Sequence, residues 1–107
     1  MRADRVEKDE EILVDIISCD DEPDLHDIHL SGRTVDVSET GMKVTMTVKV
    51  PAKTHLGLRL DMNSHVFRLE GEVRWAKNDG QVMVGVLIDQ DSPDYKKWTE
   101  MFELDAE

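Results

Sequence analysis

The sequence contains little cysteine and no long apolar run, and each shortage argues against a class of protein. Cys19 is the one cysteine among 107 residues, so the chain cannot form an intramolecular disulfide. No apolar run approaches the roughly 20 residues that a membrane-spanning helix needs. The first residues are charged and lack the apolar core of a secretory signal peptide. These features predict a cytoplasmic protein without a membrane partner.

Positive charge is also scarce. Lys and Arg total 13 against 24 Asp and Glu, which gives a formal net charge of -11 at pH 7. A chain this acidic lacks the positive surface that displaces counterions, so we expect neither a nucleic acid polymer nor an anionic membrane as partner. An anionic ligand must therefore be held by local arginines, and the chain has six: Arg2, Arg5, Arg33, Arg59, Arg68 and Arg74.

Signatures of catalysis and of metal binding are missing. The sequence has no Gly-x-Ser-x-Gly elbow, no phosphate loop and no dinucleotide fingerprint. His26 and His29 are three residues apart, so on a strand their side chains point to opposite faces. The acidic segment 19–24 lacks the spaced ligands and the fixed glycine of a calcium loop, and we interpret it as a solvated turn. We expect no catalytic residue, no metal and no cofactor.

The chain does contain a series of short β-rich segments. In residues 42–50, Met and Val alternate with Lys and Thr, a pattern typical of a half-buried antiparallel strand. Ser31-Gly32 predicts a bulge or kink in its strand. Asp79-Gly80 predicts a tight hairpin because glycine accepts a positive φ. Five further strands are expected over residues 12–17, 28–37, 56–60, 66–76 and 81–88.

Only the C-terminal segment has helical spacing. Ser92 is expected to be the N-cap and Pro93 the first helical residue. Apolar and aromatic side chains then recur on one face, which indicates a stripe packed on the core: Tyr95, Trp98, Met101 and Phe102. The whole pattern predicts an all-β antiparallel barrel or sandwich with one terminal helix.

The polar segment 36–41, Asp-Val-Ser-Glu-Thr-Gly, separates two predicted strands. One interpretation is a structural turn, because Asp and Ser side chains bond to nearby backbone and glycine adopts conformations that other residues resist. The other interpretation is a guanine site. A carboxylate accepts hydrogen bonds from the N1–H and exocyclic amine of guanine, a serine hydroxyl donates or accepts, and glycine lets a flat base approach.

The Asp-x-Ser-x-x-Gly pattern of this segment resembles the second signature of PilZ domains, which are bacterial receptors for cyclic di-GMP. Residues 70–75, Glu-Gly-Glu-Val-Arg-Trp, with the hairpin and residues 84–88 that follow, are similar to the closing strands of that family. The resemblance covers about residues 10–104. It implies a six-stranded antiparallel β-barrel over residues 11–107, with a C-terminal helix over 93–104, and a flexible arm over residues 1–10.

The resemblance also implies a ligand site. Asp36, Ser38 and Gly41 would contact one guanine of cyclic di-GMP, and Trp75 would pack against the ligand, as its counterpart does in some members. On the residues alone, Trp75 shares the face of Phe67, Leu69, Gly71 and Val73, so a core aromatic is an equal alternative. Arg74 would point away from Trp75 on a regular strand.

The first family signature, Arg-x-x-x-Arg, is altered in this chain. Arg2-Ala3-Asp4-Arg5 is one residue shorter. In the family these arginines bind phosphate and stack on guanine, which lysine does less well. Arg2 and Arg5 would reach the ligand from a flexible arm that orders on binding. Alternatively, they only balance the neighbouring acidic residues.

The function implied by the resemblance is that of a cyclic di-GMP receptor that relays the signal to a protein effector, with no catalytic activity. The alternative is a divergent PilZ-like adaptor that does not bind nucleotide and acts through protein–protein contact. The altered arginine signature and the acidic surface favour this alternative. The sequence identifies neither the effector nor the pathway, such as motility or biofilm regulation.

Overall fold

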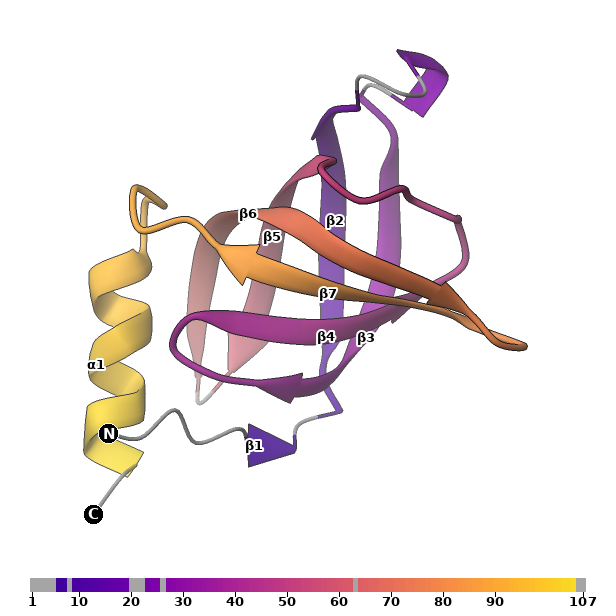
Figure 1. Cartoon of the computed structure of the whole chain (residues 1–107). Helices are drawn as coiled ribbons and strands as arrows, with labels where there is room; N and C mark the ends of the chain where they lie inside the picture. The colour runs from indigo at the N-terminus through magenta and orange to yellow at the C-terminus, as the bar shows by residue number, and fades with distance from the viewer. Residues whose placement is uncertain (1–5, 8, 20–22, 26, 63, 106–107) are drawn as a thin grey trace.

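The structure is a computed structural model that describes residues 6–7, 9–19, 23–25, 27–62 and 64–105 of the chain. Strands dominate it, and a single α-helix follows them within the described residues (Figure 1). In chain order the elements are β1 (Val6–Glu7), β2 (Glu11–Ser18), the 3-10 helix η1 (Pro23–Leu25), β3 (His29–Val37), β4 (Gly41–Met46), β5 (His55–Met62), β6 (His65–Asn78), β7 (Val82–Ile88) and α1 (Tyr95–Asp105).

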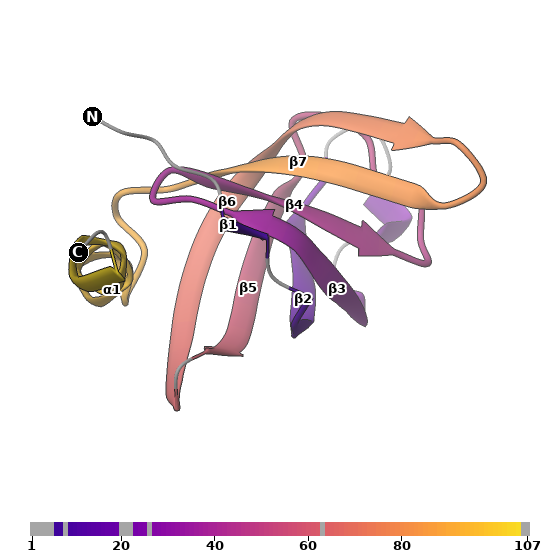
Figure 2. The same ribbon diagram turned by 90° about the horizontal axis from the view of Figure 1, so that it is seen from below.

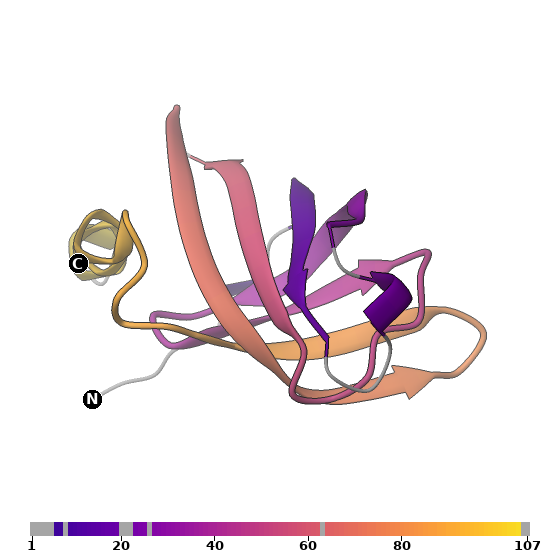
Figure 3. The ribbon, with the colours of Figure 1, turned by 90° about the horizontal axis from the view of Figure 1, so that it is seen from above.

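Six strands, β2 to β7, form a closed antiparallel barrel. Their order is β3-β2-β5-β6-β7-β4, and β4 pairs with β3 again to close the sheet. The two-residue β1 adds to β3 beside the barrel. The predicted six-stranded antiparallel barrel with a C-terminal helix is therefore confirmed. Figures 2 and 3 show α1 beside one wall of the barrel and the β6–β7 hairpin projecting on the opposite side.

Strand alternation builds the core. In β2 the residues Ile12, Val14 and Ile16 are buried, while their neighbours along the strand are exposed, and β5 repeats this pattern. Alternate side chains point to opposite faces of a strand, so every second residue enters the barrel. Trp98 and Met101 of α1 are also buried, and Trp98 packs edge-to-face on Phe67 with 5.3 Å between ring centroids.

The strand predicted over residues 42–50 ends early, at Met46. Its pairings with β3 and with β7 both stop at this residue, so no neighbouring backbone extends the ladder. Val50 is nevertheless fully buried. The alternating pattern predicted burial correctly beyond the point where hydrogen bonding ends.

The bulge predicted at Ser31-Gly32 is wrong. The pairing of β3 with β2 runs without a shift from His29 to Arg33, and the irregularity lies between Thr34 and Asp36 instead. Gly32 has a different role, because an added Cβ would overlap the Thr45 carbonyl oxygen. The predicted β6–β7 hairpin is confirmed, and Gly80 has a φ of 80°.

The helix begins at Tyr95, two residues later than predicted. Asp94 is the N-cap, since its carbonyl accepts the first helical bond from the Trp98 amide at 2.9 Å. The Ser92 hydroxyl instead lies 2.8 Å from the Glu70 amide, and the Asp94 carboxylate accepts from the Arg68 amide at 2.8 Å. These two side chains accept hydrogen bonds from backbone amides on the edge of β6 that faces away from β5. Because Ser92 is used there, it does not cap the helix, and the helix begins later than predicted.

Candidate functional site

The segment 36–41 connects β3 to β4. Asp36 and Val37 end β3, and Gly41 begins β4. The Ser38 amide donates to the Gly41 carbonyl at 2.8 Å, and the Gly41 amide donates to Ser38 Oγ at 3.1 Å. Ser38 is only 3% exposed, so its hydroxyl is committed to the turn. Ser38 therefore acts as a structural residue of the turn. Its hydroxyl could contact a base directly only if this turn opened.

Gly41 is needed for space and not for an unusual backbone conformation. Among the described glycines, the positive φ belongs to Gly80 and not to Gly41. The prediction that Gly41 adopts a backbone conformation that other residues resist is therefore wrong. A Cβ at Gly41 would lie 2.7 Å from the Val86 carbonyl oxygen of β7. The glycine therefore lets β4 and β7 approach each other beneath the turn.

Asp36 lies between two strands. It is the register partner of Lys43 on β4 and of Glu7 on β1. The Asp36 side chain is 13% exposed, and its Oδ2 lies 3.6 Å from Lys43 Nζ. The carboxylate thus faces a cross-strand lysine at the outer part of the ion-pair range.

Trp75 is turned outward by a bulge. Val73 pairs with Val86 and Trp75 with Gly85, so Arg74 is an extra residue on β6. The inserted residue reverses the alternation, and Trp75 is 36% exposed. Its indole covers Gly85, where an added Cβ would overlap the ring. The core interpretation of Trp75 is therefore wrong, which leaves an aromatic surface open to a ligand.

Arg74 and Trp75 line the same hollow. The expectation that Arg74 points away from Trp75 assumed a regular strand, and the bulge removes that condition. The hollow has a volume of about 150 Å³ and is also lined by Gly41 and Lys43. Lys77 lies over the indole, 5.8 Å from its centroid. The two cations that line the hollow each face a carboxylate, Arg74 with Glu72 at 3.9 Å and Lys43 with Asp36, so their positive charge is partly neutralised.

The N-terminal part of the chain reaches this site through β1. Arg2 and Arg5 lie outside the described residues. Val6, the residue that follows Arg5, pairs with Val37, which lies between Asp36 and Ser38. The described backbone therefore places Val6 and Glu7, the residues that follow the arginine segment in the chain, beside the Asp-x-Ser-x-x-Gly turn.

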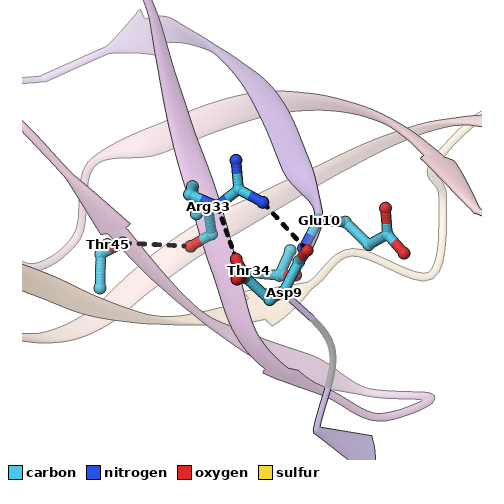
Figure 4. Close-up of polar contacts among 5 residues, drawn as sticks. All are labelled: Asp9, Glu10, Arg33, Thr34 and Thr45. Atoms are coloured by element: carbon cyan, nitrogen blue, oxygen red, sulfur yellow. Dashed lines mark hydrogen bonds and ion pairs between the residues drawn. The ribbon is translucent and has the colours of Figure 1, made fainter.

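Arg33 is engaged elsewhere. Its Nε donates to Asp9 Oδ1 at 2.6 Å and its Nη2 to the Asp9 carbonyl at 3.1 Å (Figure 4). The hydrogen bond to Asp9 raises the pKa of Arg33. Beside it, the Glu10 amide donates to Thr34 Oγ1 at 2.9 Å, and the Thr34 amide donates to the Glu10 carbonyl at 2.9 Å. These bonds fasten Asp9 and Glu10, just before β2, to β3.

A contact that sequence reasoning missed joins α1 to the turn. Trp98 Nε1 donates to the Ser38 carbonyl at 3.1 Å, and Trp98 is fully buried. The helical stripe predicted that Trp98 is buried but gave no partner for its N–H. A buried indole N–H requires an acceptor, so the sequence could have predicted that Trp98 has one. It could not identify the acceptor, because Ser38 is 60 residues away in the chain.

Other kinds of site are not evident in the described part of the chain. No group of three or more His, Cys, Asp or Glu side chains there is arranged to hold a metal ion. No helix among the described residues is long and apolar enough to cross a membrane.

A family model for the PilZ domain matches residues 6–101. The chain belongs to the PilZ domain family. No curated protein matches the sequence significantly. The hollow beside the Asp-x-Ser-x-x-Gly turn is therefore a feature of a PilZ domain, and the resemblance found from the motifs is confirmed.

Solved PilZ structures share the fold. The crystal structure of the PilZ domain of CeSA from a cellulose-synthesizing bacterium has a TM-score of 0.71 at 19% identity, covering 96% of this chain and 99% of that one. The PilZ domain of YcgR from Escherichia coli with c-di-GMP has a TM-score of 0.67 at 14% identity, with coverages of 94% and 86%. The Bacillus subtilis inhibitor of motility, MotI/DgrA, gives 0.71 at 11%, with coverages of 94% and 48%.

Proposed function

We propose that this PilZ domain is a cytoplasmic receptor that binds cyclic di-GMP and relays the signal to a protein partner, without catalysing a reaction. The observation that carries the proposal is the hollow beside the Asp-x-Ser-x-x-Gly turn, where Trp75 and Arg74 meet Gly41 and Lys43. An exposed indole next to two cations suits a ligand with flat bases and phosphates. The similar YcgR domain was solved with c-di-GMP, which supports the proposal by analogy.

The proposed roles follow from the chemistry of each group. Asp36 accepts hydrogen bonds from the guanine edge after releasing Lys43, which then lies near the phosphates. Ser38 holds the turn that presents Asp36 and Gly41. Trp75 stacks on a base. Arg2 and Arg5 bind the phosphates, and Arg5 is next in the chain to Val6, which pairs within the motif.

The arm is needed because the hollow is shallow. Its volume of about 150 Å³ is below the roughly 300–1,000 Å³ of typical ligand pockets. The dinucleotide would therefore lie on the barrel surface and be covered by the arm. The ligand would shift the arm toward the closed position only to the extent that it binds the closed position more tightly than the open one.

Isothermal titration of the full chain with cyclic di-GMP tests the proposal. The wild type should release or absorb heat, and Asp36→Ala and Arg5→Ala should each weaken binding about tenfold or more, since a hydrogen bond to a charged group contributes about 1.5–3 kcal/mol. Lys49→Ala removes an exposed charge outside the site and should bind like the wild type. Absence of heat at high micromolar ligand, with no ordering of the arm by NMR, would disprove nucleotide binding.

The second candidate is a PilZ-like adaptor that does not bind nucleotide. The shortened Arg2-Ala3-Asp4-Arg5 segment favours it, because one phosphate contact of the family pattern is misplaced. The Ser38 hydroxyl, already committed to the turn, also favours it. An effector that is captured without the dinucleotide, and equally by the Arg5→Ala and Asp36→Ala variants, would decide for the adaptor.

A further inference from the structure

Two arginines lie side by side on the outside of the barrel. Arg59 of β5 and Arg68 of β6 are direct cross-strand partners. Like charges in this position destabilise an antiparallel pair. Arg68 has a counter-charge in Asp94, whose Oδ2 lies 3.7 Å from its Nε. In the described part of the chain Arg59 has no carboxylate at ion-pair distance, although the chain has an excess of acidic residues.

A hollow of about 500 Å³ opens beside this pair. Arg59, Arg68 and Lys97 line it together with Val66 and Asp94. Asp94 is occupied, because it accepts a hydrogen bond from the Arg68 amide at 2.8 Å. The lining is thus dominated by cations whose charge is only partly neutralised within the domain. Such a hollow attracts carboxylates.

Apolar side chains continue the surface from the same arginine. Leu13 of β2 is the cross-strand partner of Arg59 on its other side and is 47% exposed. Leu13 and Arg59 line a second hollow, of about 480 Å³, with Leu30, Ser31, His29 and Asp15. The Asp15 carboxylate in this hollow is engaged by His29 Nδ1 at 2.5 Å. Val66 is 49% exposed in the first hollow. The basic and apolar groups therefore form one surface across β2, β5 and β6, with Arg59 in the middle.

We propose that this surface, defined by Leu13, Arg59, Val66, Arg68 and Lys97, docks an acidic segment of the partner protein that carries an apolar side chain. Charge complementarity selects this occupant: carboxylates fit beside Arg59, and the apolar side chain fits against Leu13 or Val66. An anionic membrane is a broad surface that would face the whole acidic domain and its net charge of -11, whereas a short acidic segment meets only the local cations. The proposal rests on the relay to a protein partner but not on nucleotide binding.

The surface lies apart from the nucleotide site but shares α1 with it. Lys97 lines the basic hollow, and the next residue, Trp98, donates to the Ser38 carbonyl. The strands beneath the surface are β2, β5 and the first half of β6, whereas the nucleotide hollow is lined by β4, β7 and the second half of β6. A partner and the nucleotide can therefore occupy the domain together.

NMR titration of the full chain tests the proposal. The probes are a synthetic glutamate-rich peptide with a single leucine, the same peptide with serine in place of leucine, and inorganic phosphate. The leucine peptide should shift amide signals of β2, β5 and β6 and bind severalfold more tightly than the serine peptide. Arg59→Glu and Arg59→Ala should each weaken it about tenfold or more. Lys49→Glu, a matched charge reversal outside the surface, should not.

Four results would overturn the proposal. Equal losses for Arg59→Glu and Lys49→Glu would mean that only net charge matters. Equal binding of the two peptides, with full competition by phosphate, would mean a simple anion site. Amide shifts on another face would place docking elsewhere. Sedimentation showing a dimer that Arg59→Glu dissociates would make a second copy of the chain the occupant.

Nucleotide binding and peptide docking can be disproved independently, because different variants test them. Asp36→Ala and Arg5→Ala should leave peptide binding unchanged, and Arg59→Ala should leave the heat of cyclic di-GMP binding unchanged. Circular dichroism confirms that each variant is folded before it is titrated.

Discussion

At the scale of the residue, the site depends on glycines that leave room for a neighbour. Gly41 allows the Val86 carbonyl to approach, and Gly85 lies directly beneath the Trp75 ring. Gly57 on β5 differs, because an added Cβ there would meet the nearest atom at 3.6 Å, an ordinary contact. The same residue type is thus required at two positions and replaceable at a third.

Gly41→Ala should destabilise the domain by about 1–3 kcal/mol, the cost of overpacking a tight contact. The added Cβ would lie 2.7 Å from a backbone oxygen that cannot move alone. Urea unfolding measures the loss. Gly57→Ala is the matched control and should change stability by less than about 1 kcal/mol. Equal effects for the two variants would contradict the steric role of Gly41.

Trp75→Ala should separate ligand binding from stability. The indole is 36% exposed but covers Gly85, so its removal should cost less unfolding free energy than removal of a fully buried tryptophan. If Trp75 stacks on a guanine, its removal should weaken cyclic di-GMP binding by about 1–3 kcal/mol, or roughly tenfold or more. Calorimetry and urea unfolding give the two quantities. A large loss of stability with unchanged affinity would make Trp75 a structural residue.

At the scale of the element, α1 is fixed to the barrel by its beginning and by its buried face. Asp94 and Ser92 bond to the β6 edge, and Trp98 reaches the Ser38 carbonyl. Phe102 packs edge-to-face on Trp98 with 5.0 Å between centroids. Two neighbouring residues of the helix therefore reach the two sites: Trp98 contacts the motif turn, and Lys97 lines the basic surface.

Trp98→Phe should lower the unfolding free energy by about 1–3 kcal/mol, since it leaves the Ser38 carbonyl without this donor. The Ser38 and Gly41 amide signals should also shift in NMR spectra, because their turn loses its anchor. Phe102→Leu is a control that reduces aromatic packing but keeps the indole N–H bond. If both variants moved the turn signals equally, general packing would explain the effect.

Asp94 should make the α1 attachment sensitive to acid. The hydrogen bond from the Arg68 amide lowers the pKa of Asp94 in the folded state. Its contribution to stability is therefore complete above the unfolded pKa of about 4 and is lost as pH falls through the lower folded value. The stability difference between the wild type and Asp94→Asn should shrink over that acidic range. A pH-independent difference in urea unfolding would contradict this assignment.

At the scale of the whole molecule, the excess of negative charge shapes what the domain can bind. The net charge of -11 disfavours anionic partners in general, so the two basic places stand out. One is the hollow of Lys43, Arg74 and Trp75, and the other is the surface around Arg59 and Arg68. Anions are therefore expected to bind at these two places and not over the rest of the surface.

Added salt should stabilise the folded domain. Self-repulsion among acidic groups opposes compactness, and it is screened as the Debye length falls from about 30 Å at 0.01 M to about 8 Å at 0.15 M ionic strength. The urea midpoint should therefore rise over this range of sodium chloride. A fall would mean that attractive ion pairs such as Arg33 with Asp9 outweigh the repulsion.

The sequence by itself determined the strands, the hairpin and the motif turn. Period-two alternation in β4 and the Asp79-Gly80 turn are local signals, so they hold whatever the partner strand. The Asp36-to-Gly41 segment was also locatable, because turn residues between two strands mark a connection.

Only the tertiary structure decided the rest. A bulge depends on the register of the partner strand, so alternation could not show that Trp75 turns outward. The helix start depended on competition, since Ser92 and Asp94 serve the distant β6 edge. The Trp98 bond to Ser38 and the adjacency of Arg59 and Arg68 join segments far apart in the chain, and only barrel closure and packing bring them together.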